Sequence, residues 1–222
     1  MVYVSACIFI VVSIIHLAGC IAENRILCAV TKPLLMPLLA LAASAALIPH
    51  LPGAQYTLAL TVVALAFGTA GDIFLLSPGE KHFIAGLLCF LAGHLFWIAQ
   101  YGSAFGSVPL FETAAGTVCI AVLPAAAYFI LGKPRGAMGA GTVIYGAVLS
   151  ALVFTGIAAV HAQKPAAALY LAGALLFLAS DSMIGYSVMK KKFPLSHFLI
   201  MATYIAAQTL LTAAVVLPQR QQ

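Results

Sequence analysis

The sequence predicts an all-α membrane protein, a bundle of eight transmembrane helices that forms one integral membrane domain over residues 1–222. Of the 222 residues, 64% are hydrophobic and only 7% are charged, and the mean hydropathy is +1.13. A soluble domain of this length could not keep so apolar a surface in water. About 20 apolar residues cross the hydrocarbon core, so eight spans with short connections use nearly the whole chain.

In the first half, each helix is an apolar run bounded by proline, glycine or charged residues. The first run begins at the N-terminus without a basic segment or a cleavage site, which predicts a retained helix and not a removed signal peptide. The connections read AENR, HLPGA and SPGEK. The predicted helices are 2–22, 33–49, 55–76 and 82–101.

The second half is divided in the same way, by GKPRG and by the basic segment KKKF. Because the connections are short, neighbouring helices are expected to run antiparallel. The predicted helices are 113–131, 138–161, 165–188 and 195–217.

The distribution of lysine and arginine predicts the orientation. Two basic residues, Lys164 and Arg220, lie on one side of the predicted bundle. The other side, with the first, third, fifth and seventh connections, carries Arg25, Lys32, Lys81, Lys133, Arg135 and Lys190 to Lys192. The positive-inside rule then places the odd connections in the cytoplasm and both termini outside, in a bacterial inner membrane. The net charge of +5 thus reflects topology, and no nucleic-acid partner is expected.

A faint internal repeat is also predicted, with halves 1–101 and 113–217. TKPLLMP enters the second helix as GKPRGAM enters the sixth, and an aspartate stands late in both the third and seventh helices. Four spans in each half give a parallel repeat with its axis along the membrane normal. The repeat would gather Lys32, Asp72 and Asp181 around one cavity near the inner leaflet.

Asp72 and Asp181 are the principal candidate site residues. They stand in GTAGDIFLL and FLASDSMIG, within a chain that has only five acidic residues. A charge at membrane depth is costly, so the pair predicts a functional site, although a structural hydrogen bond or ion pair is the alternative for each. Two neighbouring carboxyl groups in a low-dielectric site can supply an acid and a base together, and the sequence leaves open which is which.

Four further polar residues are candidates for contacting a substrate or setting the acidity of the carboxyl groups. Lys32 would lie at the cytoplasmic mouth of the second helix, where a topology marker is the alternative. His94 lies in the middle of the fourth helix, where a packed neutral histidine is the alternative. Tyr204 and Gln208 share one face of the eighth helix, and their alternative is a helix–helix hydrogen bond.

No metal site and no cofactor are predicted. The chain has no HxxxH, HExxH or CxxC spacing, so a zinc site would require residues that are distant in sequence to converge. The cysteines fall mostly in apolar runs and are expected to act as small buried residues. They are Cys7, Cys20, Cys28, Cys89 and Cys119.

Five motifs in order resemble the YhhN/TMEM86 family of lysoplasmalogenases: KPLLMP, GDIFLL, FIAGLLCFLAGH, LASDSM and YIAAQ. The resemblance runs from the second helix to the eighth. It implies a multi-pass hydrolase that cleaves the vinyl ether bond of lysoplasmalogens, releasing a fatty aldehyde and glycerophosphocholine or glycerophosphoethanolamine. The implied partners are a lysophospholipid substrate and membrane lipid.

The same resemblance assigns roles to the candidate residues. Asp72 and Asp181 would be the catalytic carboxylates, Lys32 would tune them or meet the phosphate, and Tyr204 and Gln208 would form part of the site wall. One departure is Trp97, which stands where a tyrosine is expected one turn after His94.

Two other functions compete with the hydrolase. A proton-coupled secondary transporter of a small or lipid-like solute also uses intramembrane carboxylates. However, the polar candidates gather on one side, and only His94 lies near the middle of the membrane. A zinc-dependent lipid amidase is the third reading, and the missing histidine spacing disfavours it.

Overall fold

The computed structural model describes residues 2–221, apart from the side chains of Glu112, Arg220 and Gln221. Arg220, one of the two basic residues assigned to the outer side, therefore lies outside the described side chains.

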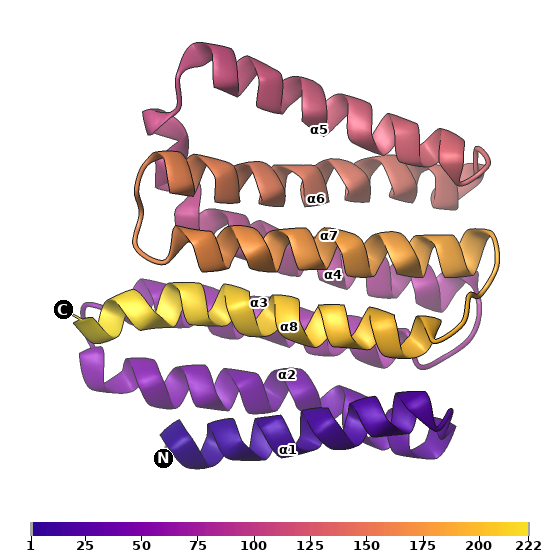
Figure 1. Cartoon of the computed structure of the whole chain (residues 1–222), viewed down its shortest axis with the longest axis horizontal. Helices are drawn as coiled ribbons and strands as arrows, with labels where there is room; N and C mark the ends of the chain where they lie inside the picture. The colour runs from indigo at the N-terminus through magenta and orange to yellow at the C-terminus, as the bar shows by residue number, and fades with distance from the viewer. Residues whose placement is uncertain (1, 222) are drawn as a thin grey trace.

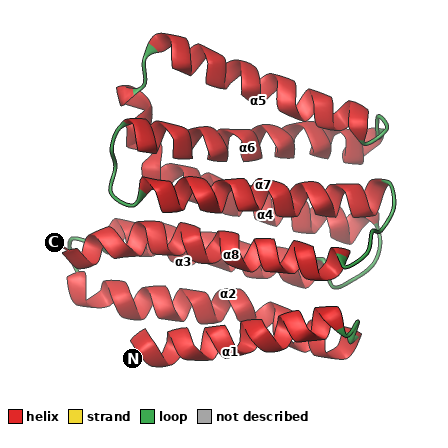
Figure 2. Ribbon diagram, viewed as in Figure 1, coloured by secondary structure: helices red, strands yellow, loops and turns green. Residues whose placement is uncertain are grey.

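The described residues form a helical bundle without strands (Figures 1 and 2). Eight of the described helices are long and apolar enough to cross a membrane, which confirms the predicted fold class. Short 3-10 helices follow three of them, at Ile48–His50, Gly102–Ser107 and Leu217–Gln221. The spanning helices are α1 Val2–Ile21, α2 Arg25–Leu47, α3 Gln55–Phe74, α4 Glu80–Tyr101, α5 Leu110–Ile130, α6 Gly136–His161, α7 Ala167–Met189 and α8 Ser196–Val216.

Successive helices run in opposite directions, as their short connections require. The connections after α1, α3, α5 and α7 lie together at one end of the bundle, on the right in Figure 1. The C-terminus and the connections after α2, α4 and α6 lie at the opposite end. The late residues of α3 and α7, which carry the two aspartates, are therefore at the same end as the predicted cytoplasmic connections.

The start of α2 differs from the prediction. The helix begins at Arg25 and not at residue 33, because Asn24 caps it: the Asn24 side-chain oxygen accepts a hydrogen bond from the Leu27 N–H at 3.0 Å. Pro33 and Pro37 lie inside the helix, as transmembrane helices tolerate when neighbouring groups satisfy the freed carbonyls. The expected position of Lys32 at the helix mouth is therefore wrong: it lies two turns inside α2, and the residue is only 9% exposed.

The two halves pack in the same order. In the first half α1 contacts α2, α2 contacts α3 and α3 contacts α4, and in the second half α5 to α8 follow the same sequence. Contacts between α4 and α6 and between α2 and α8 join the halves. The internal repeat nevertheless stays a prediction, and its KP motif is not equivalent: Lys32 and Pro33 lie within α2, whereas Lys133 and Pro134 precede α6.

Close helix contacts depend on small residues. A Cβ atom at Gly93 of α4 would lie 3.1 Å from the Ala64 carbonyl oxygen of α3, and one at Gly173 of α7 would lie 3.0 Å from the Ala207 carbonyl oxygen of α8. Small residues let transmembrane backbones approach this closely. Among the described spans α8 is the most buried and α5 the least, so α8 can carry polar groups into the interior.

Candidate active site

Asp72 is enclosed where three helices meet. It lies two residues before the end of α3 and is 1% exposed. Its Oδ1 atom is 3.4 Å from the Lys32 Nζ of α2. The Tyr204 hydroxyl of α8 donates to Oδ2 at 2.8 Å. Both oxygens of this carboxyl group therefore have a partner, which is what a buried charge requires.

The surface of α3 makes room for these partners. Gly68 stands one turn before Asp72, and a Cβ atom there would lie 3.4 Å from the Tyr204 hydroxyl and 3.3 Å from the Gln208 amide nitrogen. The absent side chain lets the polar ends of Tyr204 and Gln208 reach the surface of α3. The predicted shared face of these two residues on α8 thus faces the Asp72 helix.

Asp181 has a different environment. It lies in α7, it is only partly buried, and the Tyr145 hydroxyl of α6 donates a hydrogen bond to its Oδ2 atom. The two aspartates are close enough to interact electrostatically, and Tyr204 interacts with both. The structure therefore brings both predicted carboxylates into one region, with a tyrosine donor for each.

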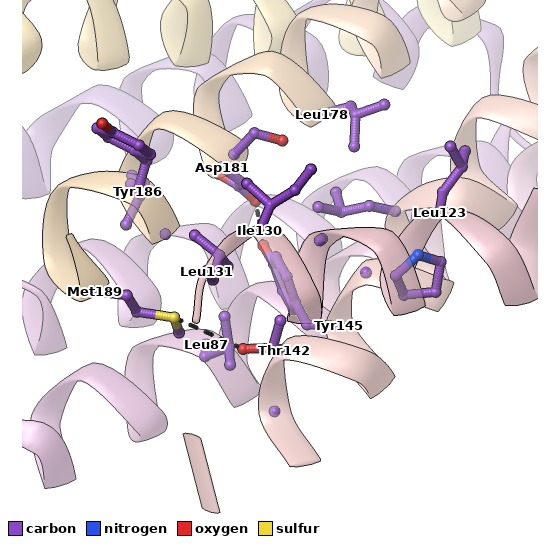
Figure 3. A pocket seen from close by; sticks show the side chains of 18 of the residues that line it. Leu87, Leu123, Ile130, Leu131, Thr142, Tyr145, Leu178, Asp181, Tyr186 and Met189 are labelled. Atoms are coloured by element: carbon purple, nitrogen blue, oxygen red, sulfur yellow. Dashed lines mark hydrogen bonds between the residues drawn. The ribbon is translucent and has the colours of Figure 1, made fainter. Parts of the chain in front are cut away.

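A cavity of about 480 Å³ leads to Asp181 (Figure 3). Its wall is mostly apolar and comes from α4, α5, α6 and α7, with Leu75 from just after α3. Residues of α5 that line it also face outward, since Leu123 is 50% exposed and Ile130 is 68% exposed. The cavity is thus reached from the lipid-facing side of the bundle, next to α5. Its size falls within the roughly 300–1,000 Å³ of typical ligand sites.

Asp72 is not among the residues that line this cavity. Phe90 of α4 lies between the two regions: it lines the cavity, and its ring centroid is 5.9 Å from that of Tyr204. A Cβ atom at Gly71, beside Asp72, would lie 2.8 Å from the Phe90 ring. The apolar cavity therefore reaches Asp181 directly, while the Phe90 ring lies between the cavity and the Asp72 carboxyl group.

His94 packs beside the site without bonding to either carboxylate. Its Nδ1 atom donates to the Phe90 carbonyl oxygen, so the neutral ring keeps the lone pair on Nε2, which has no partner among the described residues. The ring stands edge-on to Tyr145 and Phe177, with centroid separations of 5.6 and 4.3 Å. His94 therefore packs against the ring of Tyr145, whose hydroxyl bonds to Asp181.

Gln208 and Trp97 share a small polar niche with His94. The Gln208 amide oxygen and the Trp97 ring nitrogen are also buried without described partners, and all three side chains line one narrow pocket. Trp97 is 1% exposed and fills space in the core at the position where the family resemblance suggested a tyrosine.

Sequence reasoning did not single out Tyr145 or Phe90. Tyr145 stands among small and apolar residues in α6, and only its phenol group could have marked it as a candidate site residue. A second omission is the convergence of His16, Cys20 and Cys28, whose ligand atoms all lie within 4.8 Å of one another. Among the described residues this is the one group suited to hold a metal ion, and the HxxxC spacing on α1 could have indicated it.

Comparison with known proteins identifies the family. The sequence profile of the YhhN family matches residues 27–215. This chain belongs to the YhhN family. The matched YhhN region includes all the candidate carboxylates and their partners, and it leaves out the whole of α1. No solved structure matches the chain.

Several relatives carry the name lysoplasmalogenase. The chain is 34% identical over 161 residues to human lysoplasmalogenase TMEM86A, covering 69% of this chain and 64% of that protein. It is 32% identical to the bovine TMEM86A over the same length, with the same coverage. It is 31% identical over 163 residues to human lysoplasmalogenase TMEM86B, covering 72% and 65%. The matched part thus spans slightly less than two thirds of these YhhN relatives.

Proposed function

We propose that this YhhN protein is a lysoplasmalogenase, which hydrolyses the vinyl ether bond of alkenyl glycerophosphocholine or glycerophosphoethanolamine. The observation that carries the proposal is an apolar cavity, open beside α5, that ends at the Asp181–Tyr145 pair. The names of the relatives support the same reaction. A single alkenyl chain can occupy the apolar part, which places the ether bond at the carboxyl group.

The basic connections suit the phosphate of the head group. Ile130 and Met189 line the cavity, and the chain continues from them into Lys133 and Lys190. The Lys190 Nζ atom lies close to Gly132, 2.8 Å from where a Cβ atom would stand. Both lysines therefore belong to connections that adjoin this end of the cavity, and the Lys133 Nζ atom stands over the Phe129 ring, 5.1 Å from its centroid. Replacing Lys133 and Lys190 with alanine should raise KM more than it lowers kcat, and an unchanged KM would contradict this head-group position.

Asp181 is the proposed general acid and base. The Tyr145 hydroxyl donates a hydrogen bond to its Oδ2 atom, so Oδ1 is the oxygen that carries the proton transferred to the substrate. The Asp181 carboxylic acid protonates the alkene carbon that is not bonded to the ether oxygen. The resulting oxocarbenium ion carries its positive charge on the other alkene carbon, which is bonded to that oxygen. The carboxylate then takes a proton from water as this water attacks the cation, as carboxylates do in glycoside hydrolysis. The hemiacetal collapses to an aldehyde and an alcohol.

Asp72 is proposed to supply a fixed negative charge near the cation. It lies behind Phe90 and interacts electrostatically with Asp181, while Lys32 and Tyr204 hold its oxygens. Preorganised charges in a low-dielectric site stabilise developing charge effectively. In this arrangement Asp72 acts through its field, and the reacting atoms meet Asp181. No cofactor takes part in the proposed scheme.

The test is aldehyde release by the purified protein from an alkenyl lysophospholipid, beside the matched acyl lysolipid. We expect release from the alkenyl lipid alone and a loss of at least a hundredfold in kcat for Asp181→Asn, which is the lower range for general acid–base catalysis. Thr117→Val, on the exposed surface of α5, is the control and should retain activity. Proton-coupled uptake without aldehyde release would instead indicate the transporter.

A further inference from the structure

A second cluster of reactive side chains lies where α1 meets α2, apart from the cavity. His16, Cys20 and Cys28 are all buried, at 0%, 3% and 5% exposure. The Cys20 Sγ atom is 3.5 Å from the His16 Nε2 atom and 3.7 Å from the Cys28 Sγ atom. Neither the proposed hydrolysis nor the YhhN motifs use these residues.

Both separations from the Cys20 Sγ atom match the edges of a tetrahedral zinc site. With Zn–S bonds of about 2.3 Å and Zn–N bonds of about 2.0–2.1 Å, two sulfur ligands lie about 3.8 Å apart, and a sulfur and a nitrogen lie about 3.6 Å apart. The observed 3.7 and 3.5 Å agree with these edges. Two of the three edges thus already fit a zinc site, and the third pair of ligand atoms, the His16 ring nitrogen and the Cys28 Sγ atom, lies within 4.8 Å.

The hydrogen bonds also present the correct nitrogen of His16. The Thr31 hydroxyl donates its proton to the Leu27 carbonyl oxygen at 2.7 Å, so its oxygen can only accept from the His16 Nδ1 atom, also 2.7 Å away. Nδ1 therefore carries the hydrogen, and the Nε2 lone pair points toward Cys20. Metal-binding histidines are typically oriented in this way, by a hydrogen bond from the ring nitrogen that does not bind the ion.

Local structure on both helices builds the cluster. His16 and Cys20 are four residues apart and so share one face of α1. The cap at Asn24 begins α2 early enough to place Cys28 in its first turns. Gly19 permits the close approach, because a Cβ atom there would lie 3.3 Å from the Cys28 Sγ atom.

The charges around the cluster suit a neutral metal complex. Two thiolates balance one divalent cation, which lowers the cost of holding the ion away from water. Two cationic side chains of α2 flank Cys28 along the helix: Arg25, three residues before it, and Lys32, four residues after it, whose charge is paired with Asp72. The ring of His197, on α8, stands edge-on to His16 with centroids 6.5 Å apart. A water molecule or this imidazole can complete the tetrahedron.

We propose that His16, Cys20 and Cys28 bind one Zn²⁺ ion, which fastens α1 to the N-terminal turns of α2. Binding replaces the two thiol protons, which are released to solvent, and it needs no redox reaction. The ion would fix the part of α2 that carries Lys32, and it would join α1, which lies outside the YhhN match, to the remainder of the bundle. The predicted orientation places the cluster near the cytoplasm, where thiols stay reduced and available to a metal.

Metal analysis of the purified full-length protein tests the site. After expression with added zinc and gel filtration without chelator, we expect about one zinc ion per chain. Cys20→Ser and Cys28→Ser should each lose it. Cys89→Ser, a partly buried cysteine of α4, is the matched control and should retain it. Zinc retained by both Cys20→Ser and Cys28→Ser, or no zinc in the unaltered protein, would overturn the proposal.

A spectroscopic measurement keeps the test valid if a variant does not fold. Co²⁺ added to the unaltered, metal-stripped protein should give thiolate-to-cobalt charge-transfer absorption together with the visible bands of tetrahedral cobalt. Zn²⁺ should remove both sets of bands. Absence of the bands, or a Cys20–Cys28 disulfide found by intact-mass analysis of freshly purified protein, would contradict the metal site. Because neither readout requires catalysis, these outcomes are independent of the lysoplasmalogenase proposal.

Discussion

The two aspartates have the same chemistry but different surroundings, and this difference divides their proposed roles. Asp72 has a lysine and a tyrosine within 3.4 Å and is enclosed. Asp181 has a tyrosine donor and faces a cavity. A carboxyl group that faces the cavity can exchange protons with a substrate and water. An enclosed, paired carboxyl group is better suited to hold a fixed charge.

The Lys32–Asp72 pair is expected to be important for folding as well as for activity. Lys32→Met should destabilise the protein by about 3–5 kcal/mol, because removing one partner leaves a buried charge uncompensated. The double variant Lys32→Met with Asp72→Asn should recover much of this loss, since no unpaired charge remains. Thermal unfolding in one detergent measures both effects. If the double variant were less stable than Lys32→Met alone, the ion pair would not explain the loss.

At the scale of elements, α5 is the helix most exposed to lipid among the described spans. It packs against α6, and its residues Leu123 and Ile130 form the outer part of the cavity wall. A lipid with a single chain could enter sideways at this wall without crossing the core of the bundle. The helix that contributes least to the buried core therefore forms the proposed entrance.

Filling this entrance should slow the reaction without unfolding the protein. Leu123→Trp places a larger ring at a cavity-lining position, and we expect kcat/KM to fall by about tenfold, which corresponds to 1.4 kcal/mol. The matched control is Val122→Trp, at an adjacent residue that is also exposed but does not line the cavity. Steady-state aldehyde release compares the two. Equal activity for both variants would place the entrance elsewhere.

At the scale of the whole molecule, the orientation remains a prediction that labelling can test. Lys164 connects α6 to α7, and Lys191 connects α7 to α8, at opposite ends of the bundle. If the termini lie outside, Lys164→Cys should react with a membrane-impermeant maleimide in intact cells. Lys191→Cys should react only after permeabilisation, and the unaltered chain reports the background of native cysteines. The reverse pattern would invert the topology and place the site in the outer leaflet.

The sequence alone determined the eight spans, because the apolar composition and the lipid thickness leave few other ways to fold this chain. It also made Asp72 and Asp181 the principal candidates for the site, since a charge within an apolar run is conspicuous without any knowledge of packing. Its error at the start of α2 has a clear cause. Pro33 resembles a helix boundary in soluble proteins, whereas a transmembrane helix can continue through it when an earlier cap, here Asn24, has already begun the helix.

Only the tertiary structure decided which side chains meet. Tyr145 and Phe90 are ordinary aromatic residues in the sequence, and their relation to the carboxyl groups, like that of the predicted candidate Tyr204, depends on how α4, α6 and α8 cross. The same is true of His16, Cys20 and Cys28, which no metal-site motif joins. Hydropathy is a property of single segments and can be read along the chain. Contacts between segments depend on small residues such as Gly19 and Gly68, which set how closely two helices approach.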